Sequence, residues 1–401
     1  MNLCRIVLNF YPETGGSIED VVELSKSLKP YLTKQFLITR KYYGEHYNDK
    51  SYEESSGVHV YRENFIKWLP PGRLQALSFI PFAIRRVLWL NRKYGVDIIQ
   101  SNCVWTGVAA FVAGKILRKP IIYMAHGTDE VYGKIQGITE TLLTKIFRPS
   151  HLFVMDDGTH APKKFKKILE TKTVTVVNHG IDVKLFKPGY KNKKLKERLK
   201  IGNDFVVTST SHLIPVKGIN YAISAFYEFL KMSKAENAVL LIIGEGHLSN
   251  QLEKIARDCG IQEKAKFLGK VEHSEIKDYL SISDVVIATS TRSNVNRSTL
   301  EAMACGKPVL AFDSGNTRQA FSHMENCLLA KTGDVKDFAT KLLSLYEDTE
   351  LRSRIGENAR KFVEEARSWE SRIKMELKVF EKLLQKNLRN ENYNGITAAR
   401  E

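Results

Sequence analysis

The chain has 401 residues, a formal net charge of +16 and 43% hydrophobic residues, which suits two globular domains that each bury a core. No run of about 18 or more apolar residues indicates a transmembrane helix, and residues 1–10 have the pattern of a first strand rather than of a signal peptide. The five cysteines show neither metal-binding spacing nor a disulfide framework, so we expect a reduced, cytosolic protein.

The positive charge is unevenly distributed along the chain. Residues 1–188 carry +10, residues 189–204 carry +4 and residues 205–401 carry +2. Charge of this sign attracts phosphorylated substrates, phospholipid head groups or nucleic acid. The sequence contains no recognisable nucleic-acid reader motif, so we expect no nucleic-acid partner.

Short runs rich in Val and Ile predict strands, and amphipathic helical stretches separate many of them. The predicted strands lie at 4–10, 35–40, 58–62, 97–101, 120–127, 151–156 and 173–180 in the first half, and at 205–211, 238–246, 265–271, 284–290, 308–312 and 326–330 in the second. Among the predicted helices are 17–28, 75–94 and 220–232. This alternation indicates an α/β protein with two doubly wound, Rossmann-like domains that face a cleft.

The domain boundary is predicted near Pro188, because a charged, Gly-bounded stretch at 189–204 precedes the first strand of the second series. We therefore expect a first domain at 1–188 and a second domain at 189–368. Residues 335–386 read as consecutive helices, and the polar segment 387–401 is predicted to be a mobile tail.

Two loops of the first half follow predicted strands. Gly15 and Gly16 precede a helix that begins near Ser17, and adjacent glycines let a backbone approach an anion closely; an ordinary turn is the alternative. His126 ends a buried strand, where it could lie near a reacting carbon or be purely structural.

Two loops of the second half have similar positions. Lys217 and Gly218 precede an amphipathic helix, so Lys217 is placed to neutralise a diphosphate, with a solvated surface lysine as the alternative. Gly244 and Gly246 follow the next strand and form another loop in which a backbone can be approached closely.

The stretch from Ser290 to Asp313 is the most informative part of the chain. A strand, a polar loop and a short helix closed by Gly306 offer amide groups and a positive dipole end to an anion. Glu301, expected in the first turn of that helix, could accept hydrogen bonds from sugar hydroxyls. Ser298 to Glu301 also fits a capping box, in which Glu301 would instead bond the N-cap amide.

Taken in order, YPETGG, AHGTD, VVNHGIDVKLFKP, HLIPVKG, LIIGEG, KFLGKV and TLEAMACGKPVLA resemble the motifs of the family 4 glycosyltransferases over roughly residues 3–386. The resemblance implies a GT-B fold and a retaining glycosyltransferase that needs no metal and no cofactor. It also implies that the last helix, about 369–386, packs back onto the first domain. The donor would be a nucleotide-diphosphate sugar, and the acceptor a glycan or a lipid-linked glycan in surface polysaccharide or glycoconjugate synthesis.

The resemblance also implies roles for individual residues. Gly16 would lie against the donor diphosphate, His126 near the donor sugar and Val271 by the nucleobase. Lys217 would bind the diphosphate, Glu301 would bind the ribose hydroxyls, and the amides around Ser298 and Thr299 would face phosphate.

The sequence departs from the family pattern at two places. Ser293 stands where the family usually has a glutamate that touches the donor sugar, eight positions before Glu301. His212 stands where the family tends to have an arginine beside Lys217, and a neutral histidine supplies neither the permanent charge nor the several donors of arginine. We hypothesise that Arg297 restores this charge.

Basic and aromatic residues alternate in the segment 65–95, and 161–169 adds further lysines. This mixture suits an anionic membrane surface, which favours a cytoplasmic enzyme that is peripheral on the inner face of the plasma membrane. The alternative is an amphipathic core helix with a solvated basic face. Two other functions stay open: a nucleotide-sugar epimerase on the same fold, and a catalytically weak or silent partner subunit, which Ser293 and His212 favour.

Overall fold

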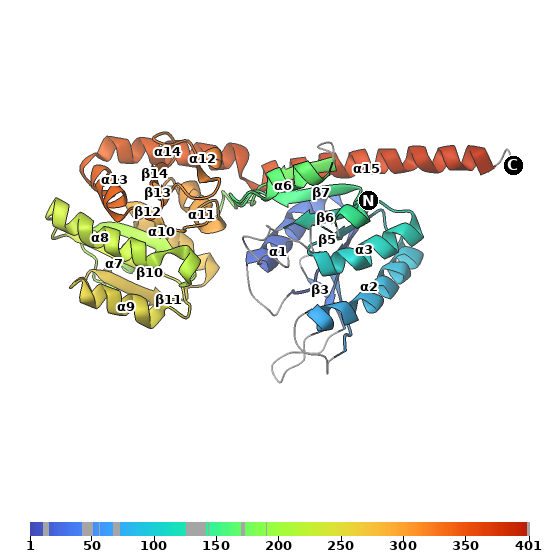
Figure 1. The fold of residues 1–401 in the computed structure, drawn as a ribbon, viewed down its shortest axis with the longest axis horizontal. Helices are drawn as coiled ribbons and strands as arrows, with labels where there is room; N and C mark the ends of the chain where they lie inside the picture. Colours follow the sequence, from blue (N-terminus) through green and yellow to red (C-terminus); the bar gives the residue numbers. More distant parts are fainter. Residues whose placement is uncertain are drawn as a thin grey trace. The chain divides into compact units, whose positions relative to one another are not determined.

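The computed structural model describes residues 1–10, 16–41, 51–55, 57–66, 73–125, 142, 144–169, 173–189 and 191–398. The chain divides into two compact units, each built on its own sheet (Figure 1). The first unit comprises Met1–Asp156, Ala161–Gly180 and Trp369–Glu401, and the second comprises Asp157–His160 and Ile181–Ser368.

The first unit contains an eight-stranded sheet in the order β3-β4-β2-β1-β5-β6-β7-β8. All neighbouring strands are parallel except β3 and β4. The strands are β1 (Asn2–Ile6), β2 (Lys34–Arg40), β3 (Tyr52–Ser55), β4 (Val58–Glu63), β5 (Ile98–Ser101), β6 (Ile121–Ala125), β7 (His151–Met155) and β8 (Val174–Val177). All seven strands predicted for this half are confirmed. The edge strand β3 was missed, because its sequence YEES is polar and mostly exposed.

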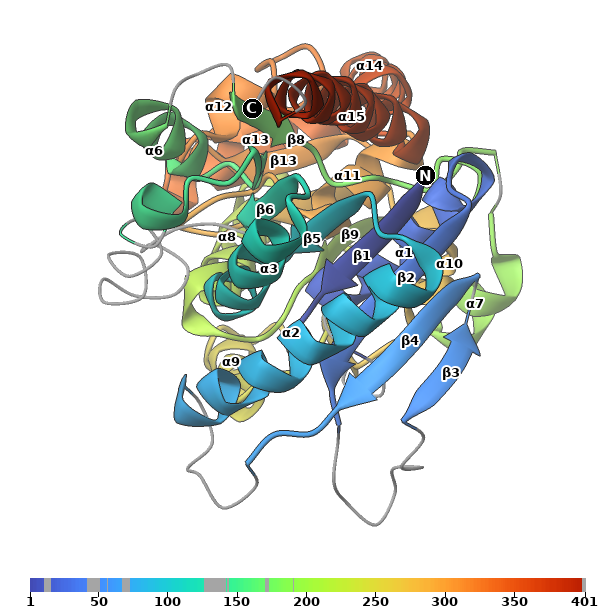
Figure 2. The ribbon, with the colours of Figure 1, turned by 90° about the vertical axis from the view of Figure 1, so that its right-hand side faces the viewer.

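Helices cover both faces of the first sheet. They are α1 (Gly16–Leu28), α2 (Arg73–Tyr94), α3 (Val104–Leu117), α6 (Ala161–Ile168) and α15 (Trp369–Ala398). Figure 2 shows α2 and α3 side by side on one face, where Phe79, Val87 and Ala110 are buried in the same cluster. Side chains of α1 and α15 are buried together on strands of the same sheet in a different cluster. One face of α2 is therefore part of the core, as the amphipathic-helix alternative predicted.

The second unit contains a six-stranded parallel sheet in the order β11-β10-β9-β12-β13-β14. The strands are β9 (Phe205–Thr210), β10 (Ala238–Ile243), β11 (Ala265–Gly269), β12 (Val285–Ala288), β13 (Val309–Phe312) and β14 (Leu328–Ala330), and all six were predicted. The helices are α7 (Lys193–Arg198), α8 (Ile219–Ser233), α9 (Ser249–Asp258), α10 (Ile276–Ile282), α11 (Arg297–Ala304), α12 (Thr317–Ala320), α13 (Val335–Glu347) and α14 (Thr349–Ala366).

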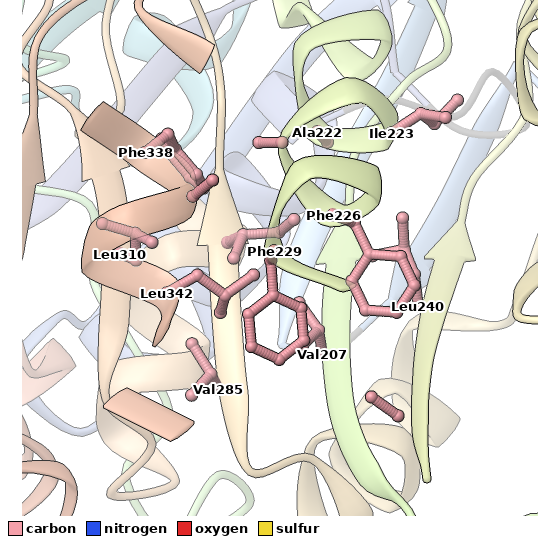
Figure 3. Packing of buried hydrophobic residues seen from close by; sticks show 14 of the residues in the cluster. Val207, Ala222, Ile223, Phe226, Phe229, Leu240, Val285, Leu310, Phe338 and Leu342 are labelled. Atoms are coloured by element: carbon pink, nitrogen blue, oxygen red, sulfur yellow. The ribbon is translucent and has the colours of Figure 1, made fainter. Parts of the chain in front are cut away.

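The chain runs outward from β9 in both directions, so β9 and its neighbour β12 form the switch point of the second sheet. All six residues of β10 are buried, as expected for a parallel strand covered on both faces. Figure 3 shows Phe226 and Phe229 of α8 and Phe338 of α13 packed with side chains of the central strands. This core fixes where the strand ends, and hence the loops that follow them, are placed.

The structure differs from the sequence predictions at the boundary between the units and in the C-terminal segment. The boundary lies at Gly180 rather than near Pro188, because Ile181 and Phe186 are buried in the second unit's core. The segment 387–401, predicted to be a mobile tail, is helical up to Ala398, since α15 continues to that residue and no proline interrupts it; its mobility stays a prediction. Within the described residues, no helix combines the length and the apolar composition that crossing a bilayer requires.

Candidate donor site at the β9/β12 switch point

The loop after β9 is held against the end of β12. Pro215 begins a 3₁₀ turn, η3 (Pro215–Lys217), and Gly218 follows with a φ of 64°. A Cβ at Gly218 would lie 2.2 Å from the carbonyl oxygen of Thr289, so only glycine fits both the backbone conformation and the space. The Thr289 hydroxyl donates to the Lys217 carbonyl at 3.2 Å, which fixes the lysine backbone at the strand end.

Lys217 is partly buried, and burial lowers the pKa of its ammonium group below the ordinary value. Within the described ranges, no group accepts a hydrogen bond from this ammonium. A desolvated, unpaired cation costs folding free energy, and a bound anion would offset that cost. The lysine is therefore suited to bind a phosphate.

The first turn of α11 lies beside this lysine. Asn296 is the N-cap, with extended backbone, and its Oδ1 accepts from the Thr299 amide at 3.1 Å and from the Ser298 hydroxyl at 2.7 Å. The Ser298 amide, second in the helix, has no intrahelical acceptor. Ser298 is therefore not the N-cap and Glu301 lies in the second turn, so the predicted capping box and the first-turn position of Glu301 are both wrong.

A small pocket joins these elements. Its walls include Lys217, the ends of β9 and β12, and the start of α11, with Ser298 and Thr299. The structure thus brings together three of the residues predicted to bind phosphate: one cation and two residues of a helix N-terminus. They meet at the switch point, where the carboxyl ends of parallel strands leave a crevice for ligands.

Glu301 is held by two basic side chains outside the walls of this pocket. Its Oε1 lies 2.6 Å from Nε2 of His273 and 3.1 Å from Nε of Arg297. The Glu301 side chain is only 4% exposed, whereas that of His273 is 37% exposed. Arg297 therefore contacts Glu301 and is not among the pocket walls, so the hypothesis that it restores charge beside Lys217 has no direct support. Val271, two residues before His273, is partly buried.

Ser293 and His212 are not walls of the pocket. The Ser293 hydroxyl donates to the backbone carbonyl of Asp157 at 2.6 Å, and His212 is exposed. Gly244 has a packing role, because a Cβ there would lie 2.0 Å from the carbonyl oxygen of Ser211. The backbone of Gly244 is thus approached closely by the loop after β9.

In the first unit, Gly16 is the first residue of α1, and His126 lies outside the described residues. Sequence reasoning missed His273 and the N-cap Asn296. Asn296 belongs to the residue types that favour caps, which was an available signal. His273 follows β11 with no local pattern that would single it out.

Known proteins resemble this chain in sequence and in fold. The family model "Glycosyl transferases group 1" matches residues 191–362, which include the switch-point pocket. A GDP-mannose-dependent monoacylated alpha-(1-6)-phosphatidylinositol monomannoside mannosyltransferase of Corynebacterium glutamicum is 30% identical over 288 residues, 68% of this chain and 74% of that protein. The N-acetyl-alpha-D-glucosaminyl L-malate synthase of Bacillus anthracis is 24% identical, covering 90% of this chain and 92% of that protein.

Solved structures share the whole fold. Anabaena Alr3699/HepE, in complex with UDP, has a TM-score of 0.76 and 20% sequence identity, covering 95% of this chain and all of that one. Sucrose-phosphate synthase from Thermosynechococcus elongatus has a TM-score of 0.75 at 18% identity, covering 96% of this chain and all of that one. The chain therefore belongs to the group 1 glycosyltransferases, of the family 4 type with the GT-B fold.

Proposed function

We propose that this glycosyltransferase is a retaining enzyme that transfers a sugar from a nucleotide-diphosphate donor to a glycan or lipid-linked acceptor in surface polysaccharide or glycoconjugate synthesis. The observation that carries the proposal is the unpaired, partly buried ammonium of Lys217 in a pocket with the N-terminus of α11. A cation and a helix N-terminus are what a diphosphate requires. Glu301 supplies a carboxylate for the ribose hydroxyls, and Val271 lies by the nucleobase.

The reaction follows from charge placement. The bond between the sugar C1 and the diphosphate oxygen breaks, and the negative charge that develops on the leaving diphosphate is stabilised by Lys217 and the α11 amides. The acceptor hydroxyl forms its bond to C1 on the face that the diphosphate leaves, and its proton passes to a leaving phosphate oxygen. On the family pattern we assign Gly16 to the diphosphate and His126 to the donor sugar.

In this proposal the cationic side chain and the peptide dipoles do the work that a divalent ion does in other transferases, so no metal or cofactor is required. Turnover in a chelator should equal turnover in magnesium. A loss of activity in EDTA that added magnesium restores would contradict this part of the proposal.

The donor nucleotide can be identified by a thermal-shift panel of nucleoside diphosphates and their sugar conjugates. Relatives favour two bases, because one is named as GDP-mannose-dependent and the HepE structures contain UDP or UDP-glucose. A ligand that binds only the folded state raises the melting temperature by mass action. Lys217→Ala should remove the shift, and the absence of any shift in the wild type would contradict the proposal.

A catalytically silent partner subunit is the second candidate. Position 293 has a serine and therefore no carboxylate for a donor sugar. Its hydroxyl donates a hydrogen bond to the Asp157 carbonyl. A silent subunit would bind the nucleotide sugar yet show neither transfer nor slow hydrolysis of the donor. Measuring donor hydrolysis with the pure protein separates the two candidates. The epimerase alternative lacks a specific observation in its favour.

We further propose that the first unit associates with anionic lipid on the cytoplasmic face of the plasma membrane. On α2, Trp89 is 40% exposed, and Arg86, which pairs with Glu63, and Lys93 each lie 5.0 Å from its ring centroid. Such aromatic and cationic groups suit the head-group region of a bilayer. Flotation with anionic liposomes at low salt should recover the protein, Trp89→Ala should weaken recovery, and no binding of the wild type would contradict this proposal.

A further inference from the structure

The carboxylate of Glu301 is asymmetrically bonded. Its Oε1 accepts from both His273, at 2.6 Å, and Arg297, at 3.1 Å. An ionised carboxylate can only accept, so Nε2 of His273 carries the hydrogen. Two donors on one oxygen, one of them a permanent cation, fix the rotation of the carboxylate group.

The other oxygen, Oε2, has no hydrogen-bond donor in the part of the chain that the structure describes. The Glu301 side chain is nonetheless only 4% exposed. Oε2 is not among the fully buried oxygens that lack a partner, so it remains accessible to a donor from a ligand. Two adjacent hydroxyls of a ribose are neutral donors that can bond Oε2 without disturbing the hydrogen bonds on Oε1.

The two basic residues come from different elements, which makes the arrangement rigid. Arg297 is the first residue of α11 and reaches Glu301 one helical turn later. His273 begins η4 (His273–Glu275), after β11, and its ring centroid lies 5.6 Å from that of Phe186. The aromatic neighbour and the carboxylate together restrict where the imidazole can lie.

We propose that His273 and Arg297 are positioning residues that hold Oε1 of Glu301 and direct Oε2 to the ribose diol, so that the site selects ribonucleotide donors over 2′-deoxyribonucleotides. This inference rests on the proposed function and deepens it. A site built to bond a hydroxyl discriminates strongly against an analogue that lacks it, because its polar group is then left unpaired. With Glu301 free to rotate, that discrimination is lost.

The competing account is that the two residues only neutralise a buried charge. In that case their removal lowers the free energy of unfolding and weakens the binding of all nucleotides by the same factor. The ratio of the dissociation constants for a ribonucleoside diphosphate and its 2′-deoxy analogue separates the accounts, since general loss of stability leaves this ratio unchanged.

The experiment is calorimetric titration of the full chain with matched ribo and 2′-deoxy forms of UDP and GDP. For the base that binds, the wild type should prefer the ribo form by about tenfold or more, the effect expected for one well-made hydrogen bond to a charged group. His273→Ala and Arg297→Ala should each reduce the preference to about threefold or less. His273→Gln retains an amide donor and should restore most of it.

Arg257→Ala is the matched control. Arg257 forms the same type of i,i+4 pair with Glu253 on α9, at 3.8 Å and with both side chains exposed. This variant should keep the wild-type preference. Circular dichroism and melting temperature establish that each variant is folded, and a folded double variant, His273→Ala with Arg297→Ala, tests the pair if one residue alone suffices.

The outcomes are distinguishable. If the wild type prefers the ribo form and the preference survives in both single variants and in the double variant, the inference is wrong and the proposed function stands. Equal binding of both forms by the wild type also overturns the inference and leaves the proposed function intact. If the wild type binds neither these four nucleotides nor any member of the thermal-shift panel, the proposed function fails and the inference fails with it; if the panel identifies another base, the same comparison is made with the ribo and 2′-deoxy forms of that base.

Discussion

The hydroxyl of Ser293 donates a hydrogen bond to the backbone carbonyl of Asp157, with 2.6 Å between the two oxygens. The same hydroxyl accepts from the amide of Val295 at 3.1 Å, and a Cβ on Gly158 would lie 2.1 Å from it. The position where the family usually has a sugar-binding glutamate therefore joins two loops of the second unit. A longer carboxylate side chain would have to displace the Gly158 backbone or turn away from it.

The Asn294 side chain holds the same loop by hydrogen bonds, and replacing it should destabilise the second unit. Its Oδ1 accepts from the Ser290 amide at 3.0 Å, and its Nδ2 bonds the carbonyls of Ser290 and Phe312 and the hydroxyl of Ser314. The side chain is buried, so Asn294→Ala leaves several polar groups unpaired and should cost roughly 2–4 kcal/mol of unfolding free energy. Urea denaturation followed by circular dichroism measures this.

Asn250→Ala is the control for that prediction. Asn250 is an exposed residue of α9, where substitution should change the unfolding free energy by no more than about 0.5 kcal/mol. Because Ser290 and Asn294 are walls of the pocket, Asn294→Ala should also weaken nucleotide binding, and Asn250→Ala should not. Equal stability of the two variants would contradict the structural role of Asn294.

Nucleotide binding should depend on pH through Lys217. Burial lowers its pKa in the free protein, and a bound diphosphate favours the protonated form and raises the pKa again. Binding therefore takes up a proton when the pH lies between the two values, so affinity should fall as the pH rises above neutral toward the ordinary lysine pKa of about 10.4. The phosphate itself titrates near pH 6, outside this window.

Calorimetry at pH 8–9.5 in buffers of different ionisation enthalpy measures that proton uptake. Lys217→Met should bind about 10–100-fold more weakly, which is the range for a hydrogen bond to a charged group, and should take up no proton. If the variant shows the same proton uptake as the wild type, the proton goes to another group and this assignment is wrong.

The alternation of apolar runs with helices was enough to predict both sheets, because parallel strands buried on both faces have continuous apolar sequences. The strand β3 escaped prediction because an edge strand can be polar. Lys217 was predicted from its position after a strand and before a helix, Ser298 and Thr299 from the family resemblance, and the structure brings all three to one pocket.

Other features depend on tertiary contacts that no local pattern reveals. Asn296 and Ser298 are both good N-cap residues, and the choice of Asn296 is set by its extended backbone, with a φ of −137°. His273 and Glu301 are 28 residues apart in sequence, and only the fold of the second unit makes them partners. The boundary at Gly180 likewise depends on where Phe186 is buried, which composition does not encode.

Arg372 should be essential to the stability of the first unit. It is fully buried, pairs with Glu376 at 2.6 Å and with Asp20 at 3.7 Å, and bonds the carbonyl of Asn178. Arg372→Met leaves buried carboxylates unpaired and should cost about 3–5 kcal/mol of unfolding free energy. In the double variant with Glu376→Leu, part of this loss should be recovered, because one unpaired carboxylate is gone.

Tryptophan fluorescence reports this unfolding selectively, because Trp89, Trp105 and Trp369 belong to the first unit and the sequence from 181 to 368 contains no tryptophan. Lys374→Met, which removes an exposed pair with Glu370 on the same helix, is the control and should cost less than about 1 kcal/mol. If the double variant is no more stable than Arg372→Met, the unpaired carboxylate is not the main cost.

His151 should make the first unit less stable as the pH falls. Burial, and secondarily Lys382, lowers its pKa from 6.5 to about 4, while Nε2 lies 2.8 Å from the Thr175 hydroxyl. The unfolded chain then binds more protons than the folded one between these values, so stability is lost as the pH falls through about 6.5 toward 4. Going from pH 7.5 to 5.0 should cost about 2 kcal/mol through this residue. Glutamine does not titrate, so the unfolding free energy of His151→Gln should change less between pH 7.5 and 5.0 than that of the wild type, by this amount. Urea denaturation followed by tryptophan fluorescence measures both proteins. An identical pH dependence in the two would show that His151 is not the titrating group.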